Sequence, residues 1–287
     1  MAVHNVLVIT GGAGGMGLAC ARALADRGRL LLVDVREDLL DQASKALSGH
    51  GADVETLRCN VTSPADVAAV ADRVRELGRL RCLVHTAGVS PEMADAATVL
   101  DVDLAGSVRI TDALFPLVNP GSSAILIGSI AGYSDVPATV EPLLDDPLAD
   151  GFLAAIEQAL GKALDSATAY VLAKRGVTRL AERLATPWGK RGGRTVAISP
   201  GLIDSTMGRT GGAALPVYEV AETERKLGSR SEKACKEVPL GRQGRLLEVV
   251  AAIDFAASDA ASFLNGIDIP VDGGSTAKWR ITGLSDH

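Results

Sequence analysis

Short apolar segments alternate with longer amphipathic segments along this chain, and the alternation limits the folds that it can adopt. Polar and apolar residues do not alternate within the apolar segments, as expected of strands that are covered on both faces. Seven strands are predicted, at residues 6–10, 30–34, 54–60, 82–88, 124–129, 194–199 and 267–271. Strands that alternate with helices form parallel sheets with right-handed crossovers. We therefore expect an α/β fold, in which residues 1–287 form a single doubly wound (Rossmann-like) domain.

The composition is that of a folded globular protein. Apolar residues make up 47% of the chain, and the net charge of −6 argues against nucleic acid or an anionic membrane as the main partner. No apolar run has the length of a membrane span. The four cysteines form no CxxC pair and the four histidines lack metal-ligand spacing, so we expect reduced thiols and no metal site. The N-terminus lacks a signal-peptide pattern, and we expect a soluble, cytoplasmic protein.

A glycine-rich segment, TGGAGGMG at residues 10–17, lies between the first predicted strand and the first predicted helix. Glycines allow a tight turn and a close approach of the backbone to a diphosphate, and the helix N-terminus offers it free N–H groups. The segment fits two registers of the dinucleotide-binding pattern, GxGxxG from Gly12 and TGxxxGxG from Thr10. Because of its strand–turn–helix context, we interpret it as a dinucleotide-binding loop rather than a glycine-rich turn without a ligand.

The second predicted strand ends at Asp34. A carboxylate at this position accepts hydrogen bonds from the adenosine ribose hydroxyls and repels the 2′-phosphate of NADP. Arg36 is the one nearby cation, and it follows Asp34 rather than replacing it. We therefore expect NAD as the cofactor.

Taken together, a series of segments resembles the motifs of the short-chain dehydrogenase/reductase family over nearly the whole chain. The segments are TGGAGGMG at 10–17, Asp34, NV at 60–61, HTAG at 85–88, GSIAG at 128–132, YVLAK at 170–174, ISPGLIDSTM at 198–207, PLGRQG and VDGG. Each is modest alone, but their order is specific. The resemblance implies a doubly wound sheet, commonly in the strand order 3-2-1-4-5-6-7, and hydride transfer between nicotinamide C4 and an alcohol or carbonyl carbon.

The resemblance also implies a role for individual residues. The catalytic residues would be Ser129, which would hydrogen-bond the substrate oxygen, Tyr170 and Lys174, together with Asp103 in the segment DVDLAG. Asn60 and Val61 would flank the adenine, and Ile203 and Ser205 would meet the nicotinamide carboxamide. The implied cofactor-binding residues are Gly11, Gly15, Met16, Gly17, Asp34, Asn60, Val61, Ala87, Gly88, Tyr170, Lys174, Pro200, Ile203 and Ser205.

Tyr170 and Lys174 are four positions apart on one predicted helix, so their side chains share a face. Oxidation of an alcohol releases a proton that the protein must accept. A lysine ammonium about 4 Å from a tyrosine hydroxyl favours the phenolate by roughly 4 kcal/mol at an effective dielectric constant near 20, which suits a general base. The alternative is a solvated helix pair, but of the three tyrosines only Tyr170 has a lysine four positions later.

The chain departs from the family pattern at four places. HTAG replaces the usual Asn-Asn-Ala-Gly, and Asn60, Asp103 and Val196 replace a usual Asp, Asn and Asn. Asp103 is the most consequential, because the family's Asn helps to hold a water that links the lysine to solvent. An Asp adds negative charge near Lys174, so we expect an altered proton relay and a shifted pH optimum, with a tolerated exchange as the alternative.

Ser129 and Tyr170 are 41 positions apart, far more than is usual in the family, which indicates an insertion at about residues 134–165. Its second half has apolar residues near helical spacing, with Asp150 as the predicted N-cap. This apolar face must pack against the substrate cleft, a partner subunit or the chain itself. Some hydroxysteroid dehydrogenases/carbonyl reductases of the family have a similar insertion, and family tetramers pack helices in this region. We therefore expect a homo-oligomer, either a dimer or an unusual tetramer.

The functional hypothesis is an NAD-dependent oxidoreductase that acts on a secondary alcohol or ketone. The apolar insertion favours a bulky hydrophobic substrate, steroid- or terpenoid-like, and residues 206–237 are interpreted as a substrate lid, with an ordinary surface excursion as the alternative. Two other functions stay open: a 3-oxoacyl or 3-hydroxyacyl thioester oxidoreductase, and a non-catalytic NAD(H)-binding sensor.

Overall fold

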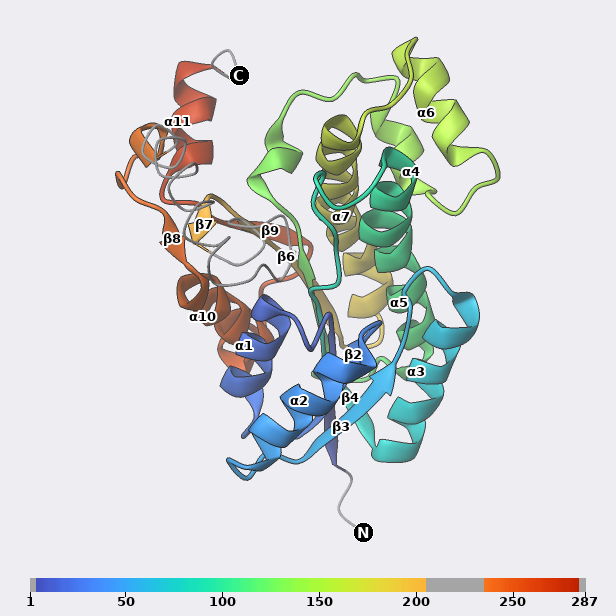
Figure 1. Ribbon diagram of the computed structural model, residues 1–287, viewed down its shortest axis with the longest axis vertical. Coiled ribbons are helices and arrows are strands. Elements are labelled where there is room, and N and C mark those ends of the chain that lie inside the picture. Colours follow the sequence, from blue (N-terminus) through green and yellow to red (C-terminus); the bar gives the residue numbers. More distant parts are fainter. Residues whose placement is uncertain (1–3, 205–234, 284–287) are drawn as a thin grey trace.

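A seven-stranded parallel sheet runs through the centre of the protein, in the order β3-β2-β1-β4-β5-β6-β9 (Figure 1). The computed structural model describes residues 4–204 and 235–283. The strands are β1 (Asn5–Thr10), β2 (Arg29–Asp34), β3 (Val54–Arg58), β4 (Arg79–His85), β5 (Ser123–Ile127), β6 (Arg194–Pro200) and β9 (Ile267–Val271). The doubly wound α/β fold and its strand order are thus confirmed.

The helices that connect these strands complete the fold. They are α1 (Gly15–Leu24), α2 (Glu37–Ser48), α3 (Pro64–Leu77), α4 (Ala96–Val99), α5 (Gly106–Leu114), α6 (Phe152–Leu160), α7 (Ser166–Gly189), α10 (Leu246–Ala257) and α11 (Ser275–Thr282). Short turns are the π-helical η1 (Leu100–Ala105) and the 3-10 turns η2 (Phe115–Leu117), η3 (Ile130–Tyr133), η4 (Glu141–Asp145) and η5 (Asp259–Ala261). A second, two-stranded sheet pairs β7 (Ile203–Asp204) with β8 (Gly244–Arg245).

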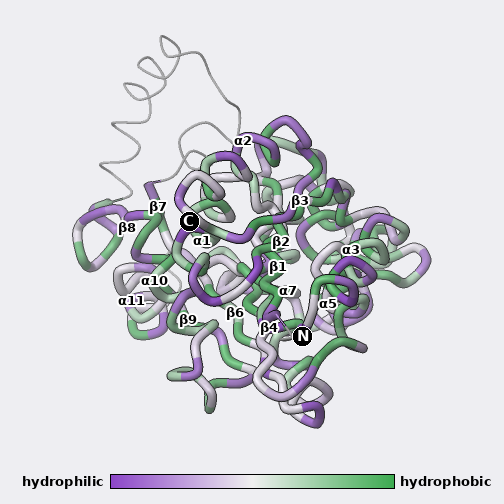
Figure 2. Tube along the Cα trace, turned by 90° about the horizontal axis from the view of Figure 1, so that it is seen from below, coloured by the Kyte–Doolittle hydropathy of each residue, from purple (hydrophilic) through white to green (hydrophobic). Residues whose placement is uncertain are grey.

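Helices cover both faces of the central sheet (Figure 1). On one face α3, α5 and α7 share a buried core with Leu83 and Leu126, and on the other α1, α2 and α10 share one with Leu7 and Val84. Figure 2 shows the hydrophobic residues gathered along the strands at the centre. Each fully buried leucine contributes about 1.5–3 kcal/mol, so these two layers explain why the central strands, such as β1 and β2, are largely apolar. Within the described residues, no helix is long and apolar enough to cross a membrane.

The two predicted helix starts have different outcomes. Helix α3 begins as predicted, with Ser63 as the N-cap that accepts a hydrogen bond from the Asp66 amide and Pro64 as the first helical residue. Helix α6 begins at Phe152 after Gly151, and no side chain caps it. The predicted Asp150 cap is therefore wrong, because Gly151 takes the cap position with a φ of 73°, a conformation that glycine adopts without strain.

The predicted insertion contains η4 and α6, and its apolar side chains pack against the chain itself. Val140, Leu144 and Ile156 are fully buried in the core that α7 also lines. Of the three alternatives for this apolar face, the structure therefore shows the third. Helix α6 lies next to η4 at the upper end of the molecule (Figure 1).

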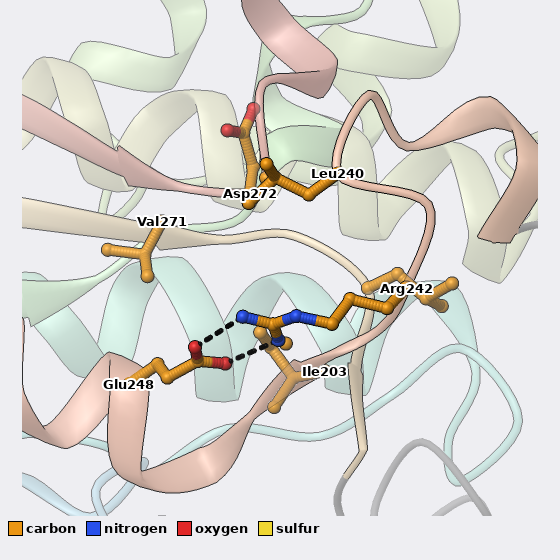
Figure 3. A pocket seen from close by; sticks show the side chains of 9 residues that line it. Ile203, Leu240, Arg242, Glu248, Val271 and Asp272 are labelled. Atoms are coloured by element: carbon orange, nitrogen blue, oxygen red, sulfur yellow. Dashed lines mark hydrogen bonds and ion pairs between the residues drawn. The ribbon is translucent and has the colours of Figure 1, made fainter.

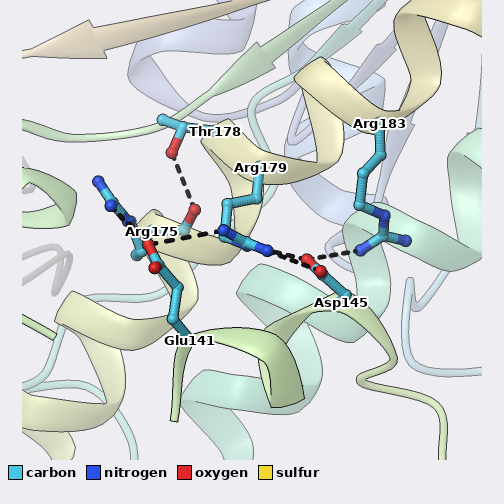
Figure 4. A network of polar contacts seen from close by, with 6 residues as sticks. All are labelled: Glu141, Asp145, Arg175, Thr178, Arg179 and Arg183. Atoms are coloured by element: carbon cyan, nitrogen blue, oxygen red, sulfur yellow. Dashed lines mark hydrogen bonds and ion pairs between the residues drawn. The ribbon is translucent and has the colours of Figure 1, made fainter. Parts of the chain in front are cut away.

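Ion pairs also join the insertion to the outer face of α7, which we define by Arg175, Arg179 and Arg183 (Figure 4). Glu141 of η4 pairs with Arg175 at 2.5 Å. Asp145 pairs with Arg179 at 2.7 Å and with Arg183 at 3.2 Å. The insertion thus covers α7 through both a buried apolar contact and a surface network.

Candidate active site

The candidate catalytic side chains come from three elements that meet at the carboxyl ends of the strands. Tyr170 and Lys174 lie on α7, Ser129 follows β5 as the N-cap of η3, and Asp103 lies on η1. Lys174 Nζ lies 5.3 Å from the centre of the Tyr170 ring and donates a hydrogen bond to the Ile127 carbonyl at 3.3 Å. Because Ile127 is the last residue of β5, this bond holds the tyrosine helix beside the strand that ends before Ser129.

Gly132 explains how η3 comes so close to α7. A Cβ atom at this position would lie 2.9 Å from the Arg175 amide nitrogen and 3.0 Å from the Lys174 carbonyl oxygen, both of which belong to the helix backbone. Only a glycine allows this approach without moving the helix. The GSIAG segment therefore fixes the distance between Ser129 and the helix that carries Tyr170.

Asp103 and Lys174 form a buried ion pair. The Asp103 Oδ2 and Lys174 Nζ atoms are 2.9 Å apart, and the two side chains are 0% and 8% exposed. The other carboxylate oxygen accepts a hydrogen bond from the Val89 amide at 2.7 Å. Burial disfavours the Lys174 ammonium, but the charges of Asp103 and Tyr170 outweigh burial and raise the pKa of Lys174 above its ordinary value.

The π-helical turn η1 gives Asp103 its place. A π-turn adds one residue to a helical turn, and such turns are frequent at functional sites. Here the turn directs a carboxylate into the core, where Gly88 leaves room for it: a Cβ on Gly88 would lie 3.3 Å from both Asp103 carboxylate oxygens.

His85 is a buried group of this region that sequence reasoning noted only as a departure from the family pattern. Its Nδ1 lies 2.6 Å from the Thr10 hydroxyl, which joins β4 to β1. Burial and the Lys174 ammonium lower the pKa of His85 to about 3, so the imidazole is neutral at physiological pH. The only sequence signal for its burial was its place at the end of an apolar strand, and nothing in the sequence showed its pKa.

The glycine loop has the shape that a dinucleotide requires. Gly11 has a φ of 64°, and a Cβ on Gly17 would lie 2.1 Å from the Gly11 carbonyl oxygen, so helix α1 packs directly on the loop. A Cβ on Gly15 would instead meet no atom within 4 Å, so the space in front of the helix N-terminus is open. No side chain caps α1, which leaves its N–H groups for an anion. The loop therefore fits the diphosphate of a dinucleotide.

Asp34 lies at the end of β2 beside this loop. Its Oδ2 accepts a hydrogen bond from the Ala13 amide at 3.2 Å, and its Oδ1 accepts one from the Arg36 amide at 3.1 Å. The Arg36 guanidinium pairs with Asp38 at 3.0 Å. The carboxylate is thus held at the loop, and the neighbouring cation is engaged with another acid.

The other residues that the resemblance implies, apart from Met16 and Ser205, lie at or just after the carboxyl ends of the strands. Asn60 and Val61 follow β3, Ala87 and Gly88 follow β4, Pro200 ends β6, Ile203 begins β7, and Met16 lies in the first turn of α1. This edge, near the point where the strand order reverses between β1 and β4, is where doubly wound sheets bind nucleotides. Ser205 and most of the predicted lid at 206–237 lie outside the described residues.

A small pocket of about 130 Å³ adjoins Ile203, where β7, β8 and the end of β9 meet (Figure 3). Its lining is mostly apolar and includes Leu240 and Val271. Arg242 and Glu248 form a two-point ion pair at its side, 2.7 and 2.9 Å between donor and acceptor atoms. The Arg242 contact lowers the pKa of Glu248 to about 2. Across the described part of the chain, no group of three His, Cys, Asp or Glu side chains is placed to hold a metal ion.

Comparisons with known proteins show which families the chain resembles. Residues 5–141 match the family described as short chain dehydrogenase, and residues 153–276 match Enoyl-(Acyl carrier protein) reductase. The break between the two matches falls within the predicted insertion.

Curated relatives and solved structures align over nearly the full length. The cis-4-hydroxycyclohexanecarboxylate dehydrogenase of Sinomonas cyclohexanicum is 33% identical, over 96% of this chain and 97% of its own. The D-threitol dehydrogenase of Mycolicibacterium smegmatis is 30% identical, over 96% and 94%. The crystal structure of gox2181 superposes with a TM-score of 0.73 at 27% identity, covering 96% of this chain and 97% of that one. An actinorhodin polyketide ketoreductase with NADPH shares the fold, with a TM-score of 0.72 at 21% identity and coverage of 94% and 97%.

Proposed function

The chain belongs to the short-chain dehydrogenase/reductase family of oxidoreductases, and on this premise we propose that it transfers a hydride between NAD and a secondary alcohol or ketone. The observation that carries the proposal is the position of Lys174. Its ammonium lies against the Tyr170 ring and is bonded to the end of the strand that precedes Ser129. Lys174 thus links the proposed proton acceptor to the strand that ends two residues before Ser129, which would hold the substrate oxygen.

The bound nicotinamide supplies the site that accepts or donates the hydride, and the protein manages the proton. In alcohol oxidation, the Tyr170 hydroxyl oxygen takes the proton of the substrate hydroxyl, and the Lys174 ammonium favours the phenolate that precedes this transfer. The Ser129 hydroxyl holds the substrate oxygen. Asp103 and the Ile127 carbonyl hold the ammonium in place.

NAD is proposed as the cofactor because of the charges beside the glycine loop. Asp34 is fixed where it would accept bonds from the ribose hydroxyls and repel a 2′-phosphate, and Arg36 is paired with Asp38. We expect NADH to bind more tightly than NADPH, and Asp34→Ser to reduce the difference. Fluorescence titration of both reduced cofactors measures it, and tighter binding of NADPH by the natural chain would contradict the assignment.

We propose a substrate class, secondary alcohols or ketones, rather than one compound. The apolar insertion favours a bulky hydrophobic, steroid- or terpenoid-like substrate, but Ile156 is buried in the chain's own core and Phe152 and Leu153 pack against that core. The two named relatives act on a hydroxycyclohexanecarboxylate and on threitol, both of which carry secondary hydroxyls. A panel of hydrophobic cyclic alcohols, polyols and 3-hydroxyacyl thioesters, followed by NADH absorbance, separates these classes.

The Tyr170→Phe variant tests the proposed function itself. We expect turnover to fall by about 10²–10⁴-fold, because the general base is lost while the ring remains. NADH should still bind, as judged by fluorescence titration. Tyr133→Phe is the matched control, since the Tyr133 hydroxyl bonds to Asp268 at 2.7 Å and has no part in the proposed proton transfer. Equal turnover in the Tyr170→Phe variant and the natural chain would favour the NAD(H)-binding sensor instead.

A further inference from the structure

We propose that Asp103 is a positioning residue that cancels the charge of Lys174 behind Tyr170, so that near neutral pH the site favours carbonyl reduction over alcohol oxidation. This inference rests on the proposed function and adds a direction to it. It starts from the buried pair, in which a carboxylate and an ammonium lie 2.9 Å apart with side chains 0% and 8% exposed.

Because the pair is buried, its two charges interact more strongly than those of a surface ion pair. Charges that are screened by water interact weakly, whereas charges in a protein interior act on one another at a much lower effective dielectric constant. Asp103 is also held in position, because its second oxygen accepts the Val89 amide and its backbone belongs to the π-turn η1. The carboxylate therefore stays beside Lys174 during the reaction.

The other ionisable groups of the cluster leave its net charge at zero. Tyr170 and Lys174 face it from α7, Asp103 from η1 and His85 from β4. His85 is neutral, because burial and the Lys174 ammonium depress its pKa to about 3. The remaining contacts are to uncharged groups, the Ile127 carbonyl, the Val89 amide and the Thr10 hydroxyl. At neutral pH one ammonium thus faces one carboxylate.

The balance of charge between Lys174 and Asp103 determines whether Tyr170 more readily donates or accepts a proton. The positive charge of a lone buried ammonium stabilises a neighbouring phenolate, and the negative charge of an adjacent carboxylate opposes that effect. In reduction, the carbonyl carbon receives the hydride and its oxygen receives the Tyr170 proton, so a protonated tyrosine is required. Oxidation reverses both transfers and requires the phenolate, which the negative charge of Asp103 disfavours.

Two uncharged replacements of Asp103 test the inference, with a control on the same turn. Asp103→Asn keeps the shape of the side chain and an acceptor for the Val89 amide, and Asp103→Ser is a second, smaller variant. Asp101→Asn is the matched control, since Asp101 pairs with Arg109 at 2.7 Å and its side chain is 46% exposed. All variants are compared as full-length chains.

The first readout needs neither cofactor nor substrate. Tyrosinate absorbance is titrated with pH in each chain and in its Tyr170→Phe derivative, and the difference isolates one of the three tyrosines. We expect the midpoint to move down by about one pH unit in Asp103→Asn and Asp103→Ser and to stay in place in Asp101→Asn. The second readout is the pH at half-maximal rate of alcohol oxidation, which should move down by the same amount.

The outcomes separate this inference from the function on which it rests. A midpoint that stays in place or rises in both Asp103 variants overturns the charge role of Asp103. A lowered midpoint without turnover of any alcohol or ketone supports that charge role and contradicts the proposed function. Lowered midpoints in both readouts support both.

Discussion

Gly15 and Gly17 are two positions apart in the glycine loop, yet the structure assigns them opposite requirements. In Gly17→Ala the new Cβ would lie 2.1 Å from the Gly11 carbonyl oxygen, in backbone that cannot yield, so we expect a loss of stability of about 1–3 kcal/mol or more. In Gly15→Ala the Cβ meets no atom, and helix α1 should be as stable as before or slightly more so.

Gly15→Ala should weaken cofactor binding although it does not destabilise the fold. The added methyl group would occupy the open space that we assign to the diphosphate, so NADH affinity should fall by about tenfold or more. Urea unfolding and fluorescence titration of NADH measure the two effects. If Gly15→Ala binds NADH as the natural chain does, the diphosphate lies elsewhere.

Because His85 is buried and neutral, we expect the folded protein to lose stability in acid. An unfolded histidine takes up a proton near its ordinary pKa of 6.5, whereas burial and the Lys174 ammonium lower the pKa of His85 to about 3 in the folded protein. The unfolded state therefore binds the proton first, and stability falls as the pH drops from about 6.5 toward 3. The slope is at most about 1.4 kcal/mol per pH unit, or about 2 kcal/mol at pH 5.

The variant His85→Asn should remove this contribution, so its free energy of unfolding should depend less on pH between about 6.5 and about 5. His50→Asn, at an exposed histidine on the surface, is the control and should follow the natural chain. Denaturant unfolding at a series of pH values gives both slopes. If the free energy of unfolding depends on pH equally in His85→Asn and the natural chain, His85 takes up a proton as readily in the folded state as in the unfolded state.

At the scale of elements, the insertion is held to α7 in two ways, and their magnitudes differ. Ile156 is fully buried, so Ile156→Ala should cost about 2–5 kcal/mol of unfolding free energy. The side chains of Asp145, Arg179 and Arg183 are 27–39% exposed, so Asp145→Asn should cost about 1 kcal/mol or less. The cost of Asp145→Asn should also shrink in high salt, because salt screens exposed charges.

Urea unfolding at low and high salt compares these two variants, and hydrogen exchange of the α6 amides shows which one releases the insertion. We expect the apolar contact to dominate. A larger cost for Asp145→Asn than for Ile156→Ala would show instead that the ion pairs hold the insertion in place.

The elements differ in how far the sequence predicted them. The strands and their order were predictable, because apolar runs between helical segments require a parallel sheet that is covered on both faces. The π-turn η1 was not, since no proline or glycine within Leu100–Ala105 marks it and its extra residue depends on packing against α7. The start of α6 was misplaced by one residue, because Gly151 and Asp150 are both acceptable caps in sequence.

At the scale of the whole molecule, the candidate site brings together positions that are far apart in sequence. His85, Asp103, Ile127 and Lys174 follow or pack on different strands and meet because parallel strands end at one edge of the sheet. Motif order predicted that Asp103 and Lys174 belong to one site, but it did not predict His85 or Ile127. The buried ion pair and the neutral histidine could not be predicted, since both depend on how far each group is removed from water.

The surfaces of the whole molecule also determine where a second copy binds. The outer face of α7 is ion-paired with the insertion, so we do not expect it to bind a second copy. Strand β9 is the last of the sheet, and within the described residues no strand pairs with its outer edge. Near it, Phe263 is fully exposed, and Phe255 and Ile267 are 47% and 36% exposed. An open edge with exposed apolar side chains is a ready surface for a symmetric contact.

We therefore expect a dimer or tetramer in which a second copy contacts this surface. Phe263→Ser should shift the protein toward the monomer, because burial of a phenylalanine contributes about 1.5–3 kcal/mol at each of the two symmetric positions. Ile281→Ser, at another exposed apolar residue on α11, is the control and should leave the assembly unchanged. Light scattering or solution scattering over a range of concentrations measures the mass. A natural chain that is monomeric throughout would contradict the expectation, and an oligomer that Phe263→Ser leaves intact would place the contact elsewhere.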